Sequence, residues 1–399
     1  MSSSGTEGLP GPGAGEGAAG LYVHIPFCRT KCPYCSFTSF PGVSEAEATG
    51  YLAALQQQAA VMADHPWVRA QQFSTMFIGG GTPTSLESDG LAELIKCCLA
   101  RYPFVQERPG GPEVSLETNP NTVTYEKLAR LRQAGANRLS IGVQSFADHL
   151  LAAIGRSHSS DDAVRAVALA RRAGFANINL DLMYGLPGQS LAEWRQTLET
   201  ALALQPQHLA LYELTIEADT VFAERASQGN LDLPGEEEAL AMEEATAELL
   251  GEAGFARYEI SNYARPGYAC GHNSNYWENS SYLGLGAGAV SCFSGVRVRN
   301  VAEPAAFIRL VTAGLPPFFE AECLDHATRF RESVIMGLRM TKGVSTAQLE
   351  ARFGLSLEAY YGAVLQELLA GGWLAMYEGR LRLTEKGRPV ANSVLSELV

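Results

Sequence analysis

The chain has 399 residues, of which 46% are hydrophobic, and this is enough length for two or three folding units with buried cores. Its 43 acidic residues outnumber its 30 basic ones, which gives a net charge of −13 and argues against a protein that binds nucleic acid by neutralising phosphates. No uninterrupted apolar run of about 18 residues occurs, so the sequence predicts no transmembrane segment.

The first twenty residues are rich in glycine and serine and contain neither Lys or Arg nor an apolar stretch. A secretory signal needs a basic start and an apolar middle, and a mitochondrial presequence needs Arg on an amphipathic helix. We therefore expect residues 1–20 to form a disordered lead-in and the protein to be cytoplasmic.

From residue 21 onward, strand-like runs alternate with helix-like runs. The expected strands are 21–25, 75–80, 113–118, 138–143, 178–185 and 208–214. The expected helices between them are 45–63, 88–101, 124–134, 160–173 and 190–203. Six such units predict an α/β fold with a parallel sheet, which amounts to about three-quarters of an eight-fold barrel.

Polar or glycine residues stand where these predicted strands end. They are Gly79-Gly80-Gly81-Thr82, Glu117, Gln144, Asp181 and Tyr212-Glu213. In barrels of this type the functional groups lie at the C-terminal ends of the strands, so we expect these residues to meet at one mouth.

The remainder of the chain predicts two further regions. Residues 216–320 are less regular and read as an extension of the barrel predicted for residues 21–215. Residues 321–399 predict helices followed by a hairpin around Glu378-Gly379 and a last helix, which is a mostly helical, winged-helix-like domain. Because Lys and Arg are sparse there, we expect a substrate lid or docking module rather than a DNA-binding wing.

Three cysteines, Cys28, Cys32 and Cys35, follow the first predicted strand within eight residues. Such closely spaced thiolates can hold one metal centre. A [4Fe-4S] cluster bound by only three cysteines leaves one iron open. Two alternatives stay open: buried thiols without a metal, and a zinc site completed by a distant ligand such as Cys270 or His272.

The spacing Cys-x3-Cys-x2-Cys, with Tyr34 directly before the third cysteine, resembles the signature of radical S-adenosylmethionine (SAM) proteins. The resemblance implies a partial (β/α)6 barrel and a [4Fe-4S] cluster whose open iron binds the amino and carboxylate groups of SAM. It also implies an electron donor such as ferredoxin or flavodoxin. The run Gly79 to Pro83 corresponds to the loop that holds the methionine amino group in this family.

The segments YVHIPFC, SLETNP, IGVQSF, GRSHS, NLDLMYGLPGQ and HNSNYW narrow the resemblance over residues 21–390. They resemble the subfamily that contains oxygen-independent coproporphyrinogen III dehydrogenase and the HemW-type haem chaperones. By position, the resemblance implies SAM contacts for Tyr22, Tyr34, Gly81, Thr82, Glu117, Gln144, Arg156 and Asp181. Asp181 suits ribose hydroxyls and Arg156 suits a carboxylate, with an internal ion pair between these two as the alternative.

Two functions fit this subfamily. One is a haem chaperone that delivers haem to haemoproteins, and the other is a dehydrogenase that decarboxylates the propionates of coproporphyrinogen III; a radical enzyme with another substrate is a third hypothesis. Phe37 stands where the dehydrogenase has a further cysteine, and the segment before residue 21 is short, which favours the chaperone.

The segment HNSNYW (residues 272–277) fits the HNxxYW motif of the chaperones. It makes His272 the candidate haem ligand, with Tyr276 and Trp277 as aromatic contacts and Cys270 as an alternative ligand. A structural histidine is the other interpretation of His272.

Overall fold

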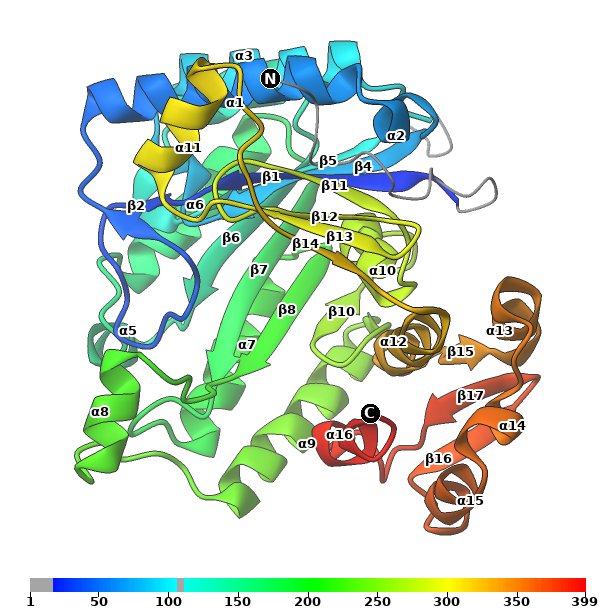
Figure 1. The fold of residues 1–399 in the computed structure, drawn as a ribbon. Helices are drawn as coiled ribbons and strands as arrows, with labels where there is room; N and C mark the ends of the chain where they lie inside the picture. Colours follow the sequence, from blue (N-terminus) through cyan, green and yellow to red (C-terminus); the bar gives the residue numbers. More distant parts are fainter. Residues whose placement is uncertain (1–16, 106–110) are drawn as a thin grey trace.

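The computed structural model describes residues 17–105 and 111–399 (Figure 1). Its centre is a sheet with the strand order β14-β13-β12-β11-β1-β4-β5-β6-β7-β8-β10-β9. The six predicted strands form its parallel middle, each within two residues of the predicted bounds: β1 (Ala19–Ile25), β4 (Phe73–Gly80), β5 (Glu113–Thr118), β6 (Arg138–Gln144), β7 (Asn177–Tyr184) and β8 (His208–Glu213).

Additional strands extend both edges, so the sheet curves into a partial barrel rather than closing. Strand β11 (Tyr282–Leu285) pairs in parallel with β1. The outer strands are antiparallel: β12 (Val290–Phe293), β13 (Val296–Asn300) and β14 (Phe318–Cys323) on one side, β10 (Asn262–Ala264) and β9 (Ala256–Arg257) on the other. Two short strands pair within the loop after β1: β2 (Phe27–Cys28) and β3 (Phe40–Pro41).

The predicted helices cover the outer face of this sheet (Figure 1). They are α1 (Glu45–Ala63), α3 (Ser88–Arg101), α4 (Tyr125–Ala134), α6 (Ser160–Arg172) and α7 (Leu191–Ala203). Ser44, Ser159 and Ser190 begin three of them with reciprocal capping boxes. Shorter or later elements connect them: α2 (Pro66–Arg69), η1 (Pro83–Ser85), η2 (Pro120–Thr122), α5 (Asp148–Ala153), α8 (Val221–Ser227), α9 (Glu236–Glu252), α10 (Gly271–Trp277) and α11 (Pro304–Thr312).

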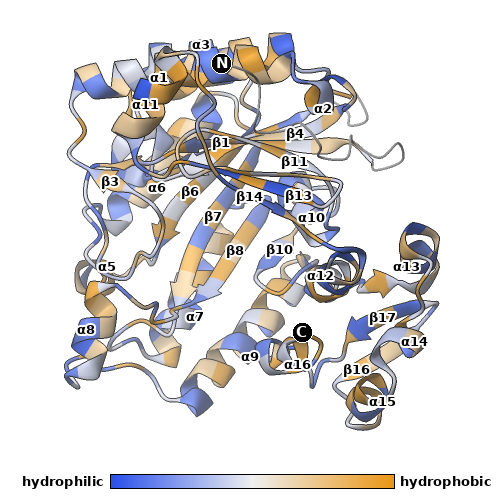
Figure 2. Cartoon of the chain, in the orientation of Figure 1, coloured by the Kyte–Doolittle hydropathy of each residue, from blue (hydrophilic) through white to orange (hydrophobic). Residues whose placement is uncertain are grey.

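The C-terminal region has its own core, which includes Phe330, Val334 and Leu381. Its sheet has the order β15-β17-β16, and the predicted hairpin turns at Glu378 and Gly379, whose φ angles of 48° and 71° suit a tight turn. The elements are α12 (His326–Leu338), β15 (Val344–Ser345), α13 (Thr346–Phe353), α14 (Leu357–Tyr361), α15 (Ala363–Ala370), β16 (Leu374–Tyr377), β17 (Arg380–Leu383) and α16 (Ala391–Ser396). Figure 2 shows hydrophobic segments on β6, β7 and β8 and hydrophilic residues on β14 and β17.

This region attaches to α10 and to the segment between β9 and β10. The Ile260 amide donates to the Arg339 carbonyl at 3.0 Å. Beside α10, Lys342 forms an ion pair with Glu278 at 2.6 Å, and the Arg339 guanidinium lies 4.7 Å above the Trp277 ring. The C-terminal region therefore rests against the helix that follows Cys270.

Candidate functional site

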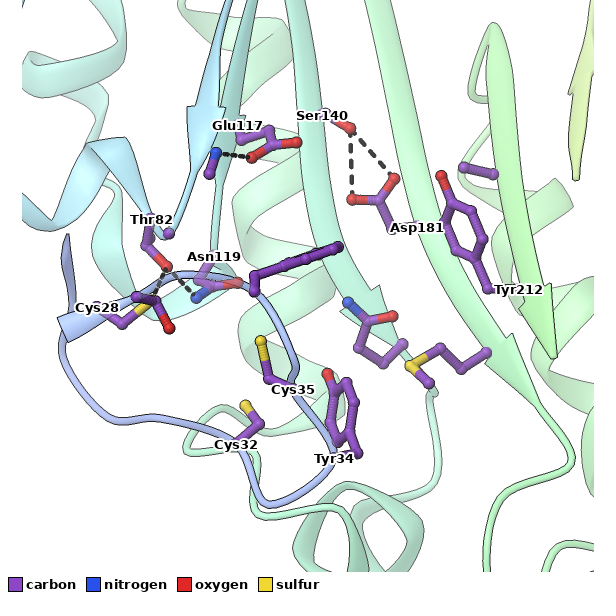
Figure 3. Close-up of a pocket in the computed structure, with 18 of the residues that line it drawn as sticks. Cys28, Cys32, Tyr34, Cys35, Thr82, Glu117, Asn119, Ser140, Asp181 and Tyr212 are labelled. Atoms are coloured by element: carbon purple, nitrogen blue, oxygen red, sulfur yellow. Dashed lines mark hydrogen bonds between the residues drawn. The ribbon is translucent and has the colours of Figure 1, made fainter. Parts of the chain in front are cut away.

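A cavity of about 440 Å³ lies inside the partial barrel and opens at the C-terminal ends of the strands. Figure 3 shows side chains from the loop after β1 and from β5, β6, β7 and β8 turned into it. Ten of the twelve residues predicted for the site line it: Cys28, Cys32, Tyr34, Cys35, Gly81, Thr82, Glu117, Gln144, Arg156 and Asp181. Every lining residue in the described parts of the chain precedes residue 274, so the C-terminal region contributes nothing to this wall, and its role as a lid or docking module stays a prediction.

The three cysteines lie on a loop that β2 and β3 hold against the end of β1. The Phe40 amide donates to the Pro26 carbonyl at 2.7 Å, which closes the loop. Cys28 Sγ lies 3.7 Å from Thr82 Oγ1, and Cys32 Sγ accepts from Arg156 Nη1 at the same distance. Burial raises the pKa of the Cys28 and Cys35 thiols, so a bound cation is needed to hold them as thiolates at neutral pH.

The donor set fits an iron–sulfur cluster better than a single metal ion. Among residues 17–105 and 111–399, no three His, Cys, Asp or Glu side chains converge closely enough to share one ion. A cubane binds each thiolate through a different iron, and therefore needs the three sulfurs spread around it.

The zinc alternative also fails on position. Cys270 Sγ donates to Glu113 Oε1 at 3.4 Å and the His272 ring bonds Thr75, so both candidate fourth ligands lie at the opposite, N-terminal ends of the strands. Neither reaches the cysteine loop.

The glycines after β4 let the backbone lie directly against the cysteine loop. A Cβ atom added at Gly81 would lie 2.6 Å from the Phe27 carbonyl oxygen, so no other residue fits there without a backbone shift. The Gly81 amide donates to the Ile25 carbonyl at 2.8 Å, and the Thr82 amide donates to the Phe27 carbonyl at 2.7 Å. This contact fixes the position of Thr82 beside Cys28.

Two carboxylates face the cavity from β5 and β7 (Figure 3). Glu117 accepts from the Gly80 amide at 2.9 Å, and Asp181 accepts from Asn179 Nδ2 at 2.6 Å and from the Ser140 hydroxyl at 3.2 Å. Burial, with a smaller contribution from the Asp181 charge, raises the pKa of Glu117 to about 7. Burial raises the pKa of Asp181 to about 6 against the opposing effect of its hydrogen bonds. A cation or a pair of hydroxyls is the ligand chemistry that such carboxylates favour.

Arg156 and Gln144 join the site from the end of α5 and the end of β6. Arg156 Nη2 donates to Asn119 Oδ1 and to the Gly142 carbonyl, both at 2.6 Å, and the described ion pairs do not include Arg156 with Asp181. The internal ion pair between these residues is therefore not formed. Gln144 has a φ of 67° where the pairing of β6 and β7 slips, a strained conformation of the kind that recurs at binding sites.

The structure does not bring Tyr22 and His272 into the cavity wall. The Tyr22 hydroxyl bonds His24 Nδ1 at 2.8 Å, and its ring stacks on Phe77 and on His272. His272 is 1% exposed; its Nδ1 bonds Thr75 Oγ1 at 2.8 Å and its Nε2 bonds the Tyr276 hydroxyl at 3.3 Å.

Both ring nitrogens of His272 form hydrogen bonds that close the floor of the barrel, and its role as the haem ligand stays a prediction. Burial lowers the pKa of His272 to about 4, which keeps this ring neutral. Of the HNSNYW segment, Asn273 is the residue that lines the cavity in the described structure. In this structure the His272 ring of the motif contacts the N-terminal ends of the strands.

Several polar residues of the cavity wall were not predicted as site residues. They are Asn119, Arg138, Ser140, Asn179 and His208, whereas Tyr212 is one of the strand-end residues expected at the mouth. Asn119 Nδ2 donates to Thr82 Oγ1 at 2.8 Å and so links β5 to the glycine loop. The period-two alternation of polar residues along β6 and β7 was the available signal, since alternate side chains of a strand point to one face.

Comparison with known proteins places these features in a family context. The chain matches the family model of the radical SAM superfamily over residues 22–201 and that of the HemN C-terminal domain over residues 324–390. It is 36% identical over 373 residues to a protein named heme chaperone HemW from Bacillus subtilis, covering 94% of this chain and 97% of the relative. A protein of the same name from Escherichia coli is 35% identical over 380 residues, with 94% and 96% covered.

A mouse protein and a solved bacterial structure are also similar to this chain. A mouse protein named radical S-adenosyl methionine domain-containing protein 1, mitochondrial, is 34% identical over 405 residues, covering 98% of this chain and 89% of the relative. The solved structure of coproporphyrinogen III oxidase HemN from Escherichia coli, described as a radical SAM enzyme, superposes with a TM-score of 0.82 at 25% identity, covering 96% of this chain and 90% of the other. Among the described residues, no helix combines the length and apolar character that crossing a bilayer requires.

Proposed function

This chain belongs to the HemW family of radical SAM proteins, and from that premise we propose that it is a haem chaperone, which binds haem and delivers it to haemoproteins. We assign a [4Fe-4S] cluster to Cys28, Cys32 and Cys35 and SAM to the adjoining cavity. The observation that carries this proposal is the cavity itself, which runs from the three cysteines to the two carboxylates Glu117 and Asp181.

The residues of the cavity divide naturally among the parts of SAM. Glu117, beside the glycine loop, suits the methionine ammonium, because a buried carboxylate gains most from a nearby cation. Asp181 suits the ribose hydroxyls, and Arg156, which already lies against Cys32, suits a carboxylate. When bound, the cluster supplies an open iron for SAM and an electron for its cleavage. Tyr34, Thr82 and the other lining residues shield this site from water.

The haem assignment rests on relatives and on one residue of the cysteine loop. Bacterial relatives that are 36%, 32% and 39% identical to this chain are named heme chaperone HemW. Phe37, which stands where the dehydrogenase carries a further cysteine, is 69% exposed at the edge of the cavity and offers an apolar contact to a porphyrin face. The dehydrogenase remains the alternative that the experiment must separate.

Two titrations on the anaerobically reconstituted full chain test the proposal. We expect about four irons and about one haem per chain, haem being followed by the Soret absorbance. The same protein, supplied with SAM and a reductant, should not convert coproporphyrinogen III to protoporphyrinogen IX. Steady decarboxylation without saturable haem binding would replace the chaperone proposal with the dehydrogenase.

Matched cysteine variants provide the control for the cluster. Cys35→Ala should lose the iron and sulfide, whereas Cys97→Ala, on the outer helix α3, should retain them. Tightly bound zinc without sulfide in the wild-type chain would contradict the cluster assignment.

An electron donor such as ferredoxin or flavodoxin and recipient haemoproteins complete the proposal. We propose that the chain and these partners act in the cytoplasm. The name of the mouse relative, by contrast, assigns that protein to mitochondria. Fractionation of cells that express the tagged full chain decides between the two compartments.

A further inference from the structure

Arg138 lies at the inner end of the cavity, and no described residue forms an ion pair with it. It precedes Ser140, Gly142 and Gln144 on β6, so it is the innermost of the four residues of that strand that line the cavity. The residue is 2% exposed, and its Nε forms no hydrogen bond. Within residues 17–105 and 111–399, its guanidinium forms no ion pair with a carboxylate.

The carboxylates around Arg138 are already occupied by other donors. Glu113 accepts from the Gly271 amide at 2.9 Å and from the His272 amide at 3.2 Å, and thereby fixes the start of α10. Asp181 accepts from Asn179 and Ser140. Both carboxylates contribute through space to raising the pKa of Arg138, against the effect of burial, but among the described residues neither forms an ion pair with it.

The remaining polar groups near Arg138 form a closed chain of hydrogen bonds. His208 Nε2 bonds the Tyr258 hydroxyl at 2.9 Å, and His208 Nδ1 bonds Asn179 Oδ1 at 2.6 Å. Asn179 Nδ2 in turn donates to Asp181. Burial and the Arg138 charge hold the pKa of His208 well below its ordinary value, so this ring stays neutral. These groups form hydrogen bonds with one another, and none of these bonds involves the Arg138 guanidinium.

Buried arginines in proteins are almost always paired, because an isolated buried charge is strongly unfavourable. A planar guanidinium with free donors matches a carboxylate, which it binds through two parallel hydrogen bonds. We propose that Arg138 binds a carboxylate of a ligand that reaches the inner end of the cavity. This anion site stands on the geometry of Arg138, whereas its two sources rest on the proposed function: a tetrapyrrole propionate, or the amino-acid carboxylate of SAM in place of its assignment to Arg156.

Two variants of Arg138 test the site on the reconstituted chain, after iron and sulfide contents are shown to equal those of the wild type. Arg138→Met removes the charge and keeps the apolar stem, and Arg138→Lys keeps a point charge without the fork. Arg130→Met, on the exposed face of α4, is the matched control.

Each ligand is paired with a form that lacks the carboxylate. Haem is compared with haem dimethyl ester, and SAM with decarboxylated SAM, by equilibrium dialysis. We expect Arg138→Met to weaken the binding of one acid ligand by about ten- to a hundredfold and to leave the binding of its carboxylate-free form unchanged. The affinity of Arg138→Lys for the acid ligand should lie between those of the wild type and Arg138→Met. The acid ligand whose binding weakens is the one whose carboxylate Arg138 binds. If haem does not bind at all, the comparison of SAM with decarboxylated SAM still tests the site.

A thermal unfolding measurement without ligand separates binding from a structural role. Because Arg138 forms no ion pair among the described residues, Arg138→Met should lower the melting temperature only by the through-space attraction of Glu113 and Asp181, whereas the loss of a structural ion pair would lower it much further. Equal binding of the acid and carboxylate-free forms by the wild type, or unchanged binding by Arg138→Met, overturns the proposal. If Arg138→Met does not fold, Arg138→Lys, which keeps a buried charge, carries the test.

Discussion

Replacing Glu117 by glutamine should flatten the dependence of stability on pH, because this carboxyl group holds a proton more tightly in the folded chain. Its folded pKa is raised to about 7 by burial, against an ordinary value of 4.5. The folded state therefore binds more protons than the unfolded state between these two values. The associated stability is fully present below pH 4.5 and is lost as the pH rises to about 7.

The size of the effect follows from the same two values. Each pH unit between 4.5 and about 7 changes the free energy of unfolding by at most about 1.4 kcal/mol for one proton. The Glu117 contribution is therefore about 3 kcal/mol at most. Glutamine keeps an oxygen for the Gly80 amide but does not titrate, so the variant should lose that much less stability between pH 5 and pH 7.5.

Urea unfolding of the cluster-free chain, followed by circular dichroism at several pH values, measures this difference. Glu126→Gln, on the exposed face of α4, is the matched control and should follow the wild-type profile. Parallel profiles for the wild type and Glu117→Gln would refute the argument that burial raises the pKa of this group.

Three further predictions concern the core and the ligand. Trp194→Ala should lower the free energy of unfolding in urea by about 3–5 kcal/mol, since the indole is fully buried and its Nε1 donates to the Met242 carbonyl at 3.0 Å. Trp67→Ala, which removes a partly buried ring, should lower the free energy of unfolding by less. Tyr51→Phe should lower it by about 1–3 kcal/mol, because the Ala287 amide loses its acceptor at 2.8 Å, and an unchanged melting temperature would contradict this. Binding of SAM near pH 7 should release protons as Glu117 ionises beside the ammonium group, so that calorimetric enthalpies differ between two buffers; identical enthalpies would count against the Glu117 assignment.

The parallel strands could be predicted because each is buried on both faces and bounded by clear turn signals. Gly135 and Gly174 end their helices with φ angles of 121° and 90°, conformations that glycine adopts at little cost. The edge strands β9 to β14 were not predicted. They are short, and β10 and β11 join the sheet by pairing with β8 and β1, which are far away in sequence, so local patterns carry little information about them.

The site could be predicted where it lies at strand ends and not where it lies within strands. The cysteine spacing and the strand-end residues Glu117 and Asp181 are sequence signals with a structural rule behind them. His272 shows the limit, because a motif specifies a ring but not the direction in which it points. Arg138 is the opposite case. The sequence shows a charged residue at the start of a buried strand, but only the structure shows that no described residue forms an ion pair with it.

The close approach of Gly81 to the cysteine loop gives a last prediction that links the fold to the cluster. A methyl group at this position would meet the Phe27 carbonyl oxygen at 2.6 Å, and a backbone atom cannot rotate away as a side chain does. Gly81→Ala should therefore displace β2, lower the free energy of unfolding by about 1–3 kcal/mol, and reduce both the iron content after reconstitution and the binding of SAM. Gly50→Ala is the matched control: it lies within α1 with no atom within 4 Å of the added methyl group, and should stabilise the chain by about 0.5–1 kcal/mol with full iron content. If Gly81→Ala retained full iron and SAM binding, the packing of the glycine loop would not be what positions Cys28, and the coupling between these two loops would have to be abandoned.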